Sequence, residues 1–231
     1  MGQLGLKIPA RISYKADNFI RHSGVRTIIN QVLSLANSEA FNLCWIEGER
    51  RSGKTHLSIT LTDLLINYKF QPRCIEGAEF KDFLESGQVE QISARTMPFI
   101  IDSAEEYFNS LTTGNSGAFV NFIEKLRVAG SLVIFLSRTS VQSLACDEHI
   151  MSRLRPGQGL KINMPADEEL PEVIAAMAKQ RGMVLSERKI EFIRRRIGRS
   201  IEAIERYLDR VYHLSSVLGR GVRFPILGDA L

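Results

Sequence analysis

Short apolar runs alternate with segments of helical periodicity over the first 165 residues of the chain. In those segments apolar side chains recur every three or four positions, which is the spacing of an amphipathic helix. The short runs are apolar throughout, as is typical of strands buried on both faces of a parallel sheet. The pattern predicts strands at 42–47, 73–77, 97–102, 132–137 and 160–164, and helices at 25–36, 56–68, 81–86 and 116–130.

The pattern changes after Pro165, where three helical periods follow one another without an intervening strand. They span 167–182, 186–198 and 200–219, and glycines and polar capping residues separate them. We therefore predict an α/β fold, with a five-stranded parallel sheet covered by helices on both faces and a C-terminal helical lid. The predicted division is an N-terminal segment 1–13, an α/β domain 14–165 and a lid 166–231.

The turn between the first predicted strand and its helix carries the most specific motif in the chain. Gly48 to Thr55 reads GERRSGKT and matches GxxxxGK[ST] in full. In such a P-loop the backbone amides and the following helix N-terminus cradle phosphates, with Gly48, Ser52 and Gly53 shaping the turn. Lys54 is expected to reach the β- and γ-phosphates and Thr55 to bind Mg²⁺, so the turn predicts a site for ATP or ADP. The alternative is a glycine turn with a surface lysine.

A second acidic position ends the predicted strand at 97–102. Asp102 would hold Mg²⁺ together with Thr55, directly or through water, although aspartate at this place can also cap the next helix. The following residue, Ser103, cannot act as a base at neutral pH. Glu105 and Glu106 would point elsewhere if a helix or turn begins at Ser103. We therefore expect weak or absent ATP hydrolysis by this chain alone.

Ser137 ends the strand predicted at 132–137. A polar side chain there can touch the γ-phosphate or the attacking water, and a serine that merely opens a loop is an equally good interpretation.

Composition sets limits on the class of protein. The chain has 231 residues and a net charge of +4, which is too small to indicate nucleic-acid binding by itself. The three cysteines, Cys44, Cys74 and Cys146, are too widely spaced for a zinc site or a disulfide framework. No apolar run approaches the ~18 residues of a membrane span, and the N-terminus does not resemble a secretory signal. The expected location is the cytoplasm.

Together these motifs resemble a known family. GERRSGKTHL from Gly48, FIIDS ending at Ser103, LSRT from Leu136, MSRL from Met151 and a three-helix lid are similar to the AAA+ family. KADNFI from Lys15 and GKTHL from Gly53 are similar, within it, to the DnaA-related proteins. The resemblance covers residues 14–218 and implies the AAA+ fold with bound ATP or ADP and Mg²⁺.

Within the DnaA-related proteins, the chain resembles the Hda-type adaptors, because it ends after the lid without a helix-turn-helix domain. This resemblance implies an adaptor that, with the DNA-loaded sliding clamp, stimulates ATP hydrolysis by DnaA and represses replication initiation. Its implied partners are DnaA and the clamp, with no sequence-specific DNA binding and no membrane. Self-association into a homo-oligomer stays open.

The resemblance also assigns residues to the two partners. A clamp-binding peptide of the form QLxLxL matches Gln3, Leu4, Leu6 and Ile8, an extended segment that would insert its apolar side chains into a groove. An ordinary packing strand is the alternative for this segment. Arg153, in MSRL, matches the arginine finger that points at a neighbour's γ-phosphate.

Two of the residue roles that the resemblance implies have alternative interpretations. A surface arginine in an ion pair is the other interpretation of Arg153, and Arg155 competes for the finger's role. Glu202 stands where the lid of the family carries a sensor arginine, and Arg199 or Arg206 could substitute from the same helix. The preference for ATP or ADP therefore stays open.

Two other functions share parts of these motifs. A helicase-loader-type AAA+ ATPase would use the same loop, strand-end aspartate and finger, but it would need a catalytic acid. A P-loop kinase would need an acceptor site with a mobile lid inserted between strands, and the sequence has no such insertion.

Overall fold

We describe a computed structural model of the chain, which covers residues 16–92, 96–111, 116–219 and 221–231. The chain divides into two compact units, with residues 15–163 in an α/β unit and residues 164–231 in a helical unit. The predicted segment 1–13 lies outside the described residues.

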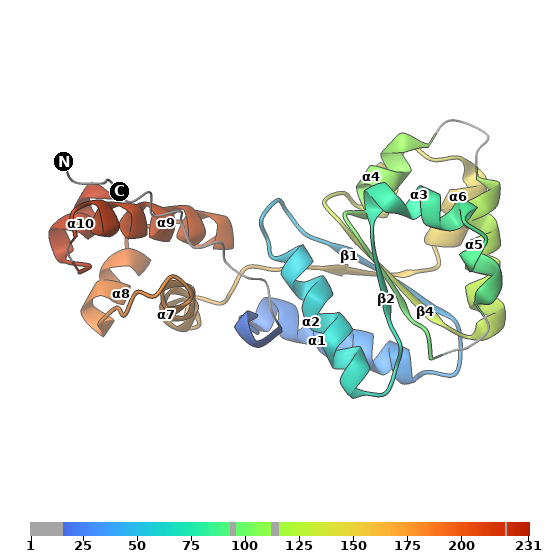
Figure 1. Cartoon of the computed structure of the whole chain (residues 1–231), viewed down its shortest axis with the longest axis horizontal. Helices are drawn as coiled ribbons and strands as arrows, with labels where there is room; N and C mark the ends of the chain where they lie inside the picture. The colour runs from blue at the N-terminus through green and yellow to red at the C-terminus, as the bar shows by residue number, and fades with distance from the viewer. Residues whose placement is uncertain (1–15, 93–95, 112–115, 220) are drawn as a thin grey trace, which may run out of the picture. The chain divides into compact units, whose positions relative to one another are not determined.

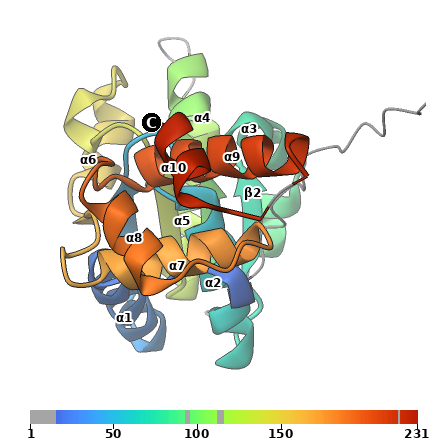
Figure 2. The same ribbon diagram turned by 90° about the vertical axis from the view of Figure 1, so that its left-hand side faces the viewer.

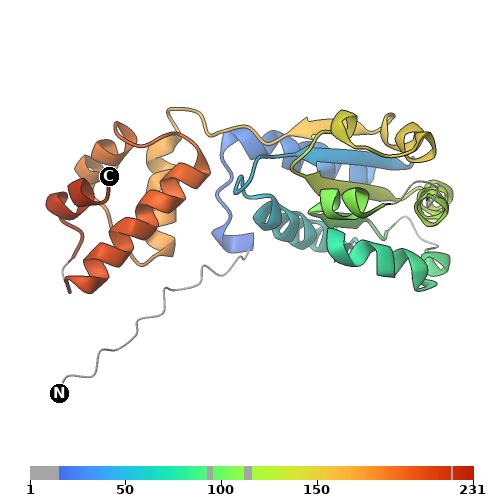
Figure 3. The same cartoon turned by 90° about the horizontal axis from the view of Figure 1, so that it is seen from above.

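Five parallel strands form the sheet of the α/β unit, in the order β2-β3-β4-β1-β5. Figures 1 and 3 show these strands side by side. The predicted fold class is therefore confirmed. The strands are β1 (Asn42–Glu47), β2 (Arg73–Glu76), β3 (Phe99–Asp102), β4 (Leu132–Ser137) and β5 (Gln158–Lys161).

Helices cover both faces of this sheet. α1 (Ser23–Asn37) and α2 (Lys54–Asn67) pack on one face, through side chains such as Val32 and Leu61. The other face is covered by α3 (Gly77–Glu85), α4 (Ala104–Ser110), α5 (Gly117–Ala129) and α6 (Glu148–Leu154). The described residues of this unit also form short 3₁₀ helices: η1 (Ala16–Asn18), η2 (Gln88–Gln91) and η3 (Val141–Ser143).

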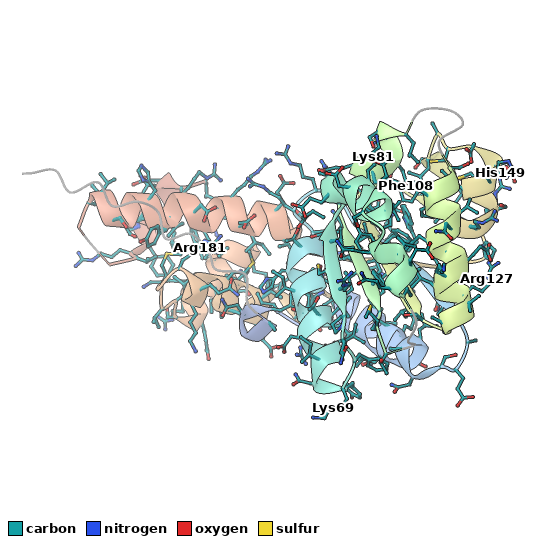
Figure 4. All side chains as sticks on the ribbon, turned by 45° about the vertical axis from the view of Figure 1, so that its right-hand side comes forward. Lys69, Lys81, Phe108, Arg127, His149 and Arg181 are labelled. Carbon is teal, nitrogen blue, oxygen red and sulfur yellow. The ribbon has the colours of Figure 1, made fainter. Side chains whose placement is uncertain are left out.

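Aromatic rings dominate the core under α3, α4 and α5. Phe122 is fully buried and meets Phe80 and Phe99 edge-to-face, with ring centroids 5.3 and 5.2 Å away. Such aromatic pairs contribute stability beyond the area they bury. Figure 4 shows Phe108 of α4 within the same α/β unit, and its ring lies 5.8 Å from that of Phe135 on β4.

The described residues of the helical unit form four helices, which are labelled in Figure 2. They are α7 (Leu170–Gln180), α8 (Glu187–Arg194), α9 (Ile201–Val217) and α10 (Phe224–Asp229). Tyr207 of α9 is fully buried and its hydroxyl donates to the carbonyl of Leu227, which ties α9 to α10. Ser200 caps α9 by accepting from the amide of Ala203.

The elements differ from the sequence predictions in a few places. α4, α6 and α10 were not predicted, because six or seven residues are too few for helical periodicity to stand out. β5 begins at Gln158, two residues before the predicted run, because Gln158 already pairs with Cys44 of β1. None of the helices in the described part of the chain combines the length and apolarity that crossing a membrane requires.

The aromatic core predicts a large loss of stability when Phe122 is truncated. Phe122→Ala should lower the free energy of unfolding by about 3–5 kcal/mol, because it removes buried apolar contacts and leaves a cavity. Val128→Ala on the same helix is the control, since Val128 is 90% exposed, and it should change stability by less than about 0.5 kcal/mol. Urea unfolding followed by circular dichroism measures both, and equal effects of the two substitutions would contradict this description of the core.

Candidate functional site

The loop after β1 turns sharply into α2. Arg51 has φ 58° and Gly53 has φ 90°, so two left-handed residues bend the backbone just before α2 begins at Lys54. Such a conformation suits glycine and strains most other residues. A Cβ on Gly48 would lie 2.5 Å from the Ser52 hydroxyl oxygen, so a larger residue there would displace the Ser52 side chain. The loop therefore has the backbone form and the helix N-terminus that suit a bound anion.

Lys54 lies folded over this loop and is only 9% exposed. Its ammonium donates to the carbonyls of Gly48 and Glu49 at 2.7 and 2.8 Å. Burial lowers the pKa of Lys54, whereas the nearby Glu105 carboxylate raises it and the Arg138 guanidinium lowers it. A buried ammonium with carbonyl partners is well placed to pair with a polyphosphate, so the lysine fits the predicted role.

Asp102 ends β3 at the same edge of the sheet and is 1% exposed. Its Oδ1 accepts from the amide of Ser103 at 2.9 Å, and its Oδ2 is buried without a hydrogen-bond partner among the described residues. Burial raises the pKa of Asp102, and the nearby Thr55 hydroxyl and the Ser103 amide oppose that rise. A buried carboxylate oxygen beside a threonine hydroxyl is a donor set that suits Mg²⁺.

Ser52 adds a second unpaired polar atom to the loop. Its hydroxyl is buried and has no hydrogen-bond partner among the described residues. An orphaned buried polar group is costly unless a ligand satisfies it. Ser52 and Asp102 thus each carry a buried polar atom that a bound ligand or metal ion could satisfy.

Ser103 links β3 to α4 in a left-handed conformation, with φ 52°. It follows Asp102 directly, so a hydroxyl stands where many P-loop ATPases carry a second acid. A Cβ on Gly77, the first residue of α3, would lie 2.1 Å from the Ser103 carbonyl oxygen. Only glycine allows this approach, which holds the end of β3 in place. The sequence analysis missed Gly77, which it placed at the last position of a predicted strand.

Ser137 is fully buried at the end of β4. Its carbonyl accepts from the amide of Gly48 at 3.0 Å, so the strand end is joined to the loop through the backbone. Its hydroxyl accepts from the amide of Thr139 at 3.0 Å and lies 3.1 Å from the Thr139 hydroxyl. Ser137 is thus joined to the loop through its carbonyl, and its hydroxyl is engaged within its own strand end.

Glu105 was expected to point away from the site if a helix began after Ser103. α4 does begin there, yet the Glu105 side chain is 6% exposed and faces the end of β4. Its Oε1 accepts from Nε of Arg138 at 2.6 Å and its Oε2 from the Arg138 amide at 3.1 Å. Burial raises the pKa of Glu105, but the hydrogen bonds from Arg138 and from the Glu105 backbone amide outweigh it and hold the pKa below its usual value.

Arg153 lies on α6 and contacts its own helix and α5. Its Nε is 3.2 Å from a carboxylate oxygen of Glu124, an ion pair not aligned as a hydrogen bond, and its Nη1 donates to the carbonyl of His149. Arg155 pairs instead with Glu148. Partly exposed pairs of this kind are worth roughly 0–1 kcal/mol. Either arginine can therefore leave its partner at little cost.

The remaining predicted residues lie outside the α/β unit or outside the described residues. Gln3, Leu4, Leu6 and Ile8 belong to the latter group. In the helical unit, Glu202 pairs with Arg206 on α9, and Arg199 pairs with Asp167 at 2.9 Å. Both arginines that could replace a sensor arginine are thus ion-paired within their own unit.

Known proteins similar to this chain share its fold. No protein-family model matches the chain. The chromosomal replication initiator protein DnaA of Flavobacterium psychrophilum is 25% identical over 225 residues, which cover 88% of this chain and 45% of that protein. The chain therefore spans less than half the length of this relative. The similarity supports homology with DnaA at low identity.

Solved structures give the same result for the fold. Domain III of the Thermotoga maritima replication initiation protein DnaA matches with a TM-score of 0.74 and 17% identity, covering 97% of this chain and 98% of that one. AMPPCP-bound DnaA from Aquifex aeolicus matches with a TM-score of 0.67 and 18% identity, covering 89% and 66% of the two chains. At these identities the likeness shows the fold alone.

Proposed function

We propose that this chain is a DnaA-related AAA+ domain that binds ATP or ADP with Mg²⁺ in the loop Gly48–Thr55. The observation that carries the proposal is a pair of buried, opposite charges at one sheet edge. The Lys54 ammonium lies over the loop, and the Asp102 carboxylate has an oxygen without a hydrogen-bond partner among the described residues. The structurally similar DnaA of Aquifex aeolicus is bound to AMPPCP, which supports a nucleotide as the ligand.

Each residue would have a distinct task in that complex. The amides from Gly48 to Thr55 and the N-terminus of α2 would bind the phosphates, and Lys54 would move from loop carbonyls to phosphate oxygens. The Thr55 hydroxyl and Asp102 would hold the metal ion, which supplies positive charge to the phosphates when it is bound. Gly77 would keep Asp102 in place through its close approach to Ser103.

The same geometry favours slow hydrolysis. Ser103 has no basic group, and the Glu105 carboxylate accepts hydrogen bonds from Arg138 that keep it ionised and fixed. A carboxylate used in this way is a poor candidate to orient or deprotonate water. The chain would therefore hold its nucleotide and turn it over weakly.

The role that follows is action on a partner ATPase. In this proposal Arg153 points at ATP bound by DnaA and stabilises charge during its hydrolysis, while Gln3, Leu4, Leu6 and Ile8 bind the DNA-loaded sliding clamp. The result is repression of replication initiation in the cytoplasm. The weak pairing of Arg153 with Glu124, together with homology to DnaA, supports this assignment.

Introducing an acid at Ser103 tests the account of slow hydrolysis. Ser103→Asp should raise ATP turnover by about 10- to 100-fold, because a correctly placed base contributes at least that much. Aspartate also tolerates the left-handed backbone found at this position. Ser103→Asn is the matched control, with the same shape and no basic group, and should leave turnover unchanged. Phosphate release under saturating ATP measures all three proteins, and equal turnover of the two variants would count against the account.

The partner role predicts a loss of stimulation when Arg153 is removed. Arg153→Ala should lower DnaA hydrolysis, measured with the clamp loaded on DNA, by about 10³-fold relative to the stimulated rate. Arg155→Ala is the matched control, because it removes a neighbouring arginine that is paired with Glu148. Normal stimulation by Arg153→Ala, or its loss in Arg155→Ala, would show that the finger is assigned wrongly.

A further inference from the structure

The helical unit carries an open hollow beside α9, with a volume of about 900 Å³. Arg196, Arg206 and Arg210 are among the residues that line it. Arg196 follows α8, and the other two arginines lie on α9; Figure 2 labels both helices. Every lining residue belongs to the helical unit, so the hollow is built without any residue of the phosphate loop.

A second hollow, of about 450 Å³, shares Arg196 with the first. Arg188, Phe192 and Phe224 also line it. The two phenylalanine rings meet edge-to-face with their centroids 5.7 Å apart, and the Arg196 guanidinium carbon lies 3.9 Å from the centroid of the Phe192 ring. The ring thus covers one face of the guanidinium. Because the two hollows share Arg196, they form one continuous surface, named here the α8–α9 surface.

The arginines of the α8–α9 surface include three without a carboxylate partner. Arg188, Arg196 and Arg210 are exposed, and none forms an ion pair with a carboxylate among the described residues. Other arginines of the unit do form such pairs: Arg181, Arg194, Arg195, Arg199 and Arg206. Positive charge without a counter-charge therefore gathers on this surface.

The acid that lines the larger hollow is already engaged elsewhere. Asp209 accepts from Nε of the buried Arg181 at 2.7 Å. Burial raises the pKa of Tyr207 to about 12 despite the opposing effect of Arg210 and Arg196, so both guanidiniums act on the same buried hydroxyl. The two unpaired arginines that line the larger hollow are thus close enough to contact a single ligand.

Apolar side chains lie among these arginines. Ile197, Ala203 and Leu231 line the larger hollow, and Phe224 lines the smaller one. Leu231 is 52% exposed and Phe224 is 45% exposed. Exposed apolar groups of this kind mark interaction sites, and arginine and aromatic residues are enriched in protein–protein interfaces. A nucleic-acid backbone would pair with the arginines but gain little from the apolar side chains, so the combination favours a peptide.

We propose that the α8–α9 surface binds an acidic segment of a partner protein, one that carries carboxylates and apolar side chains together. The carboxylates would pair with Arg196 and Arg210, whose planar guanidiniums can each donate two hydrogen bonds to one carboxylate. The apolar side chains of the segment would cover Ile197 and Leu231. This docking function of the lid goes beyond the proposed nucleotide site and does not require a bound nucleotide.

The test is an NMR titration of the isotope-labelled, nucleotide-free chain with a short synthetic peptide of alternating glutamate and leucine. The backbone amides of Gly198 and Ala203 report on the larger hollow, because both residues line it. Their signals should shift and approach saturation by about 1 mM peptide. The affinity should fall as salt is added, because exposed ion pairs are screened.

Two control peptides separate the contributions of charge and apolar area. One carries glutamine in place of glutamate, and the other carries serine in place of leucine. Each lacks one of the two features that the surface matches, so each should bind about tenfold more weakly than the glutamate–leucine peptide, or more weakly still.

A double variant tests the arginines directly. Arg196→Gln combined with Arg210→Gln should weaken binding of the glutamate–leucine peptide by about tenfold, because two partly exposed ion pairs are lost. The matched control, Lys125→Gln combined with Arg127→Gln, removes the same charge from α5, where Figure 4 labels Arg127. This control should bind the peptide as wild type does.

Several outcomes would overturn the inference. These are unchanged signals of Gly198 and Ala203 with the glutamate–leucine peptide, equal binding of either control peptide, and equal binding by the variant that lacks Arg196 and Arg210. A short single-stranded oligonucleotide is the last comparison. If it binds this surface more tightly than the glutamate–leucine peptide does, the surface takes a phosphate backbone and the assignment of an acidic protein segment is wrong.

Discussion

The arrangement of the candidate site depends on a positive charge held over a glycine turn. A buried ammonium is costly unless it has polar partners, and Lys54 finds two in the carbonyls of Gly48 and Glu49. These contacts keep the lysine over its own loop. They are neutral partners, so a phosphate that replaced them would give the lysine a full counter-charge. The site therefore favours a ligand with phosphate groups, because such a ligand supplies the counter-charge that the carbonyls lack.

The sheet gives this charge its neighbours. Because all five strands are parallel, their carboxyl ends lie at one edge, where Asp102, Ser137 and Arg138 come next to the loop. The close approach of Gly77 to the Ser103 carbonyl then fixes the end of β3, and the Gly48 amide joins the loop to β4. The loop and the end of β3 are thus held mainly by backbone contacts, whereas side-chain contacts position Lys54 and the Arg138–Glu105 pair.

The sequence predicted the parts of the structure that local pattern controls. β1 and β4 have their predicted bounds, because six consecutive apolar or strand-end positions define each run. The loop followed from its glycines and lysine. The missed parts depend on tertiary contacts. α4 has only seven residues and follows Ser103, whose backbone is left-handed, so no helical periodicity marks it in the sequence. The inward orientation of Glu105 is a consequence of that start and of Arg138, which lies 33 residues further along the chain. The roles of Arg153 and of residues 3–8 come from resemblance, and physical pattern alone would not have assigned them.

The central claim is that the loop binds a nucleotide through Lys54, and direct calorimetric titration with ATP and with ADP tests it. The matched variant is Lys54→Met, which keeps most of the side-chain length and removes the charge. The account predicts measurable binding to the wild-type chain and a loss of about 100-fold or more in the variant, as expected when two charged hydrogen bonds disappear. Equal affinity of the two proteins for both nucleotides, or no binding by either, would contradict it.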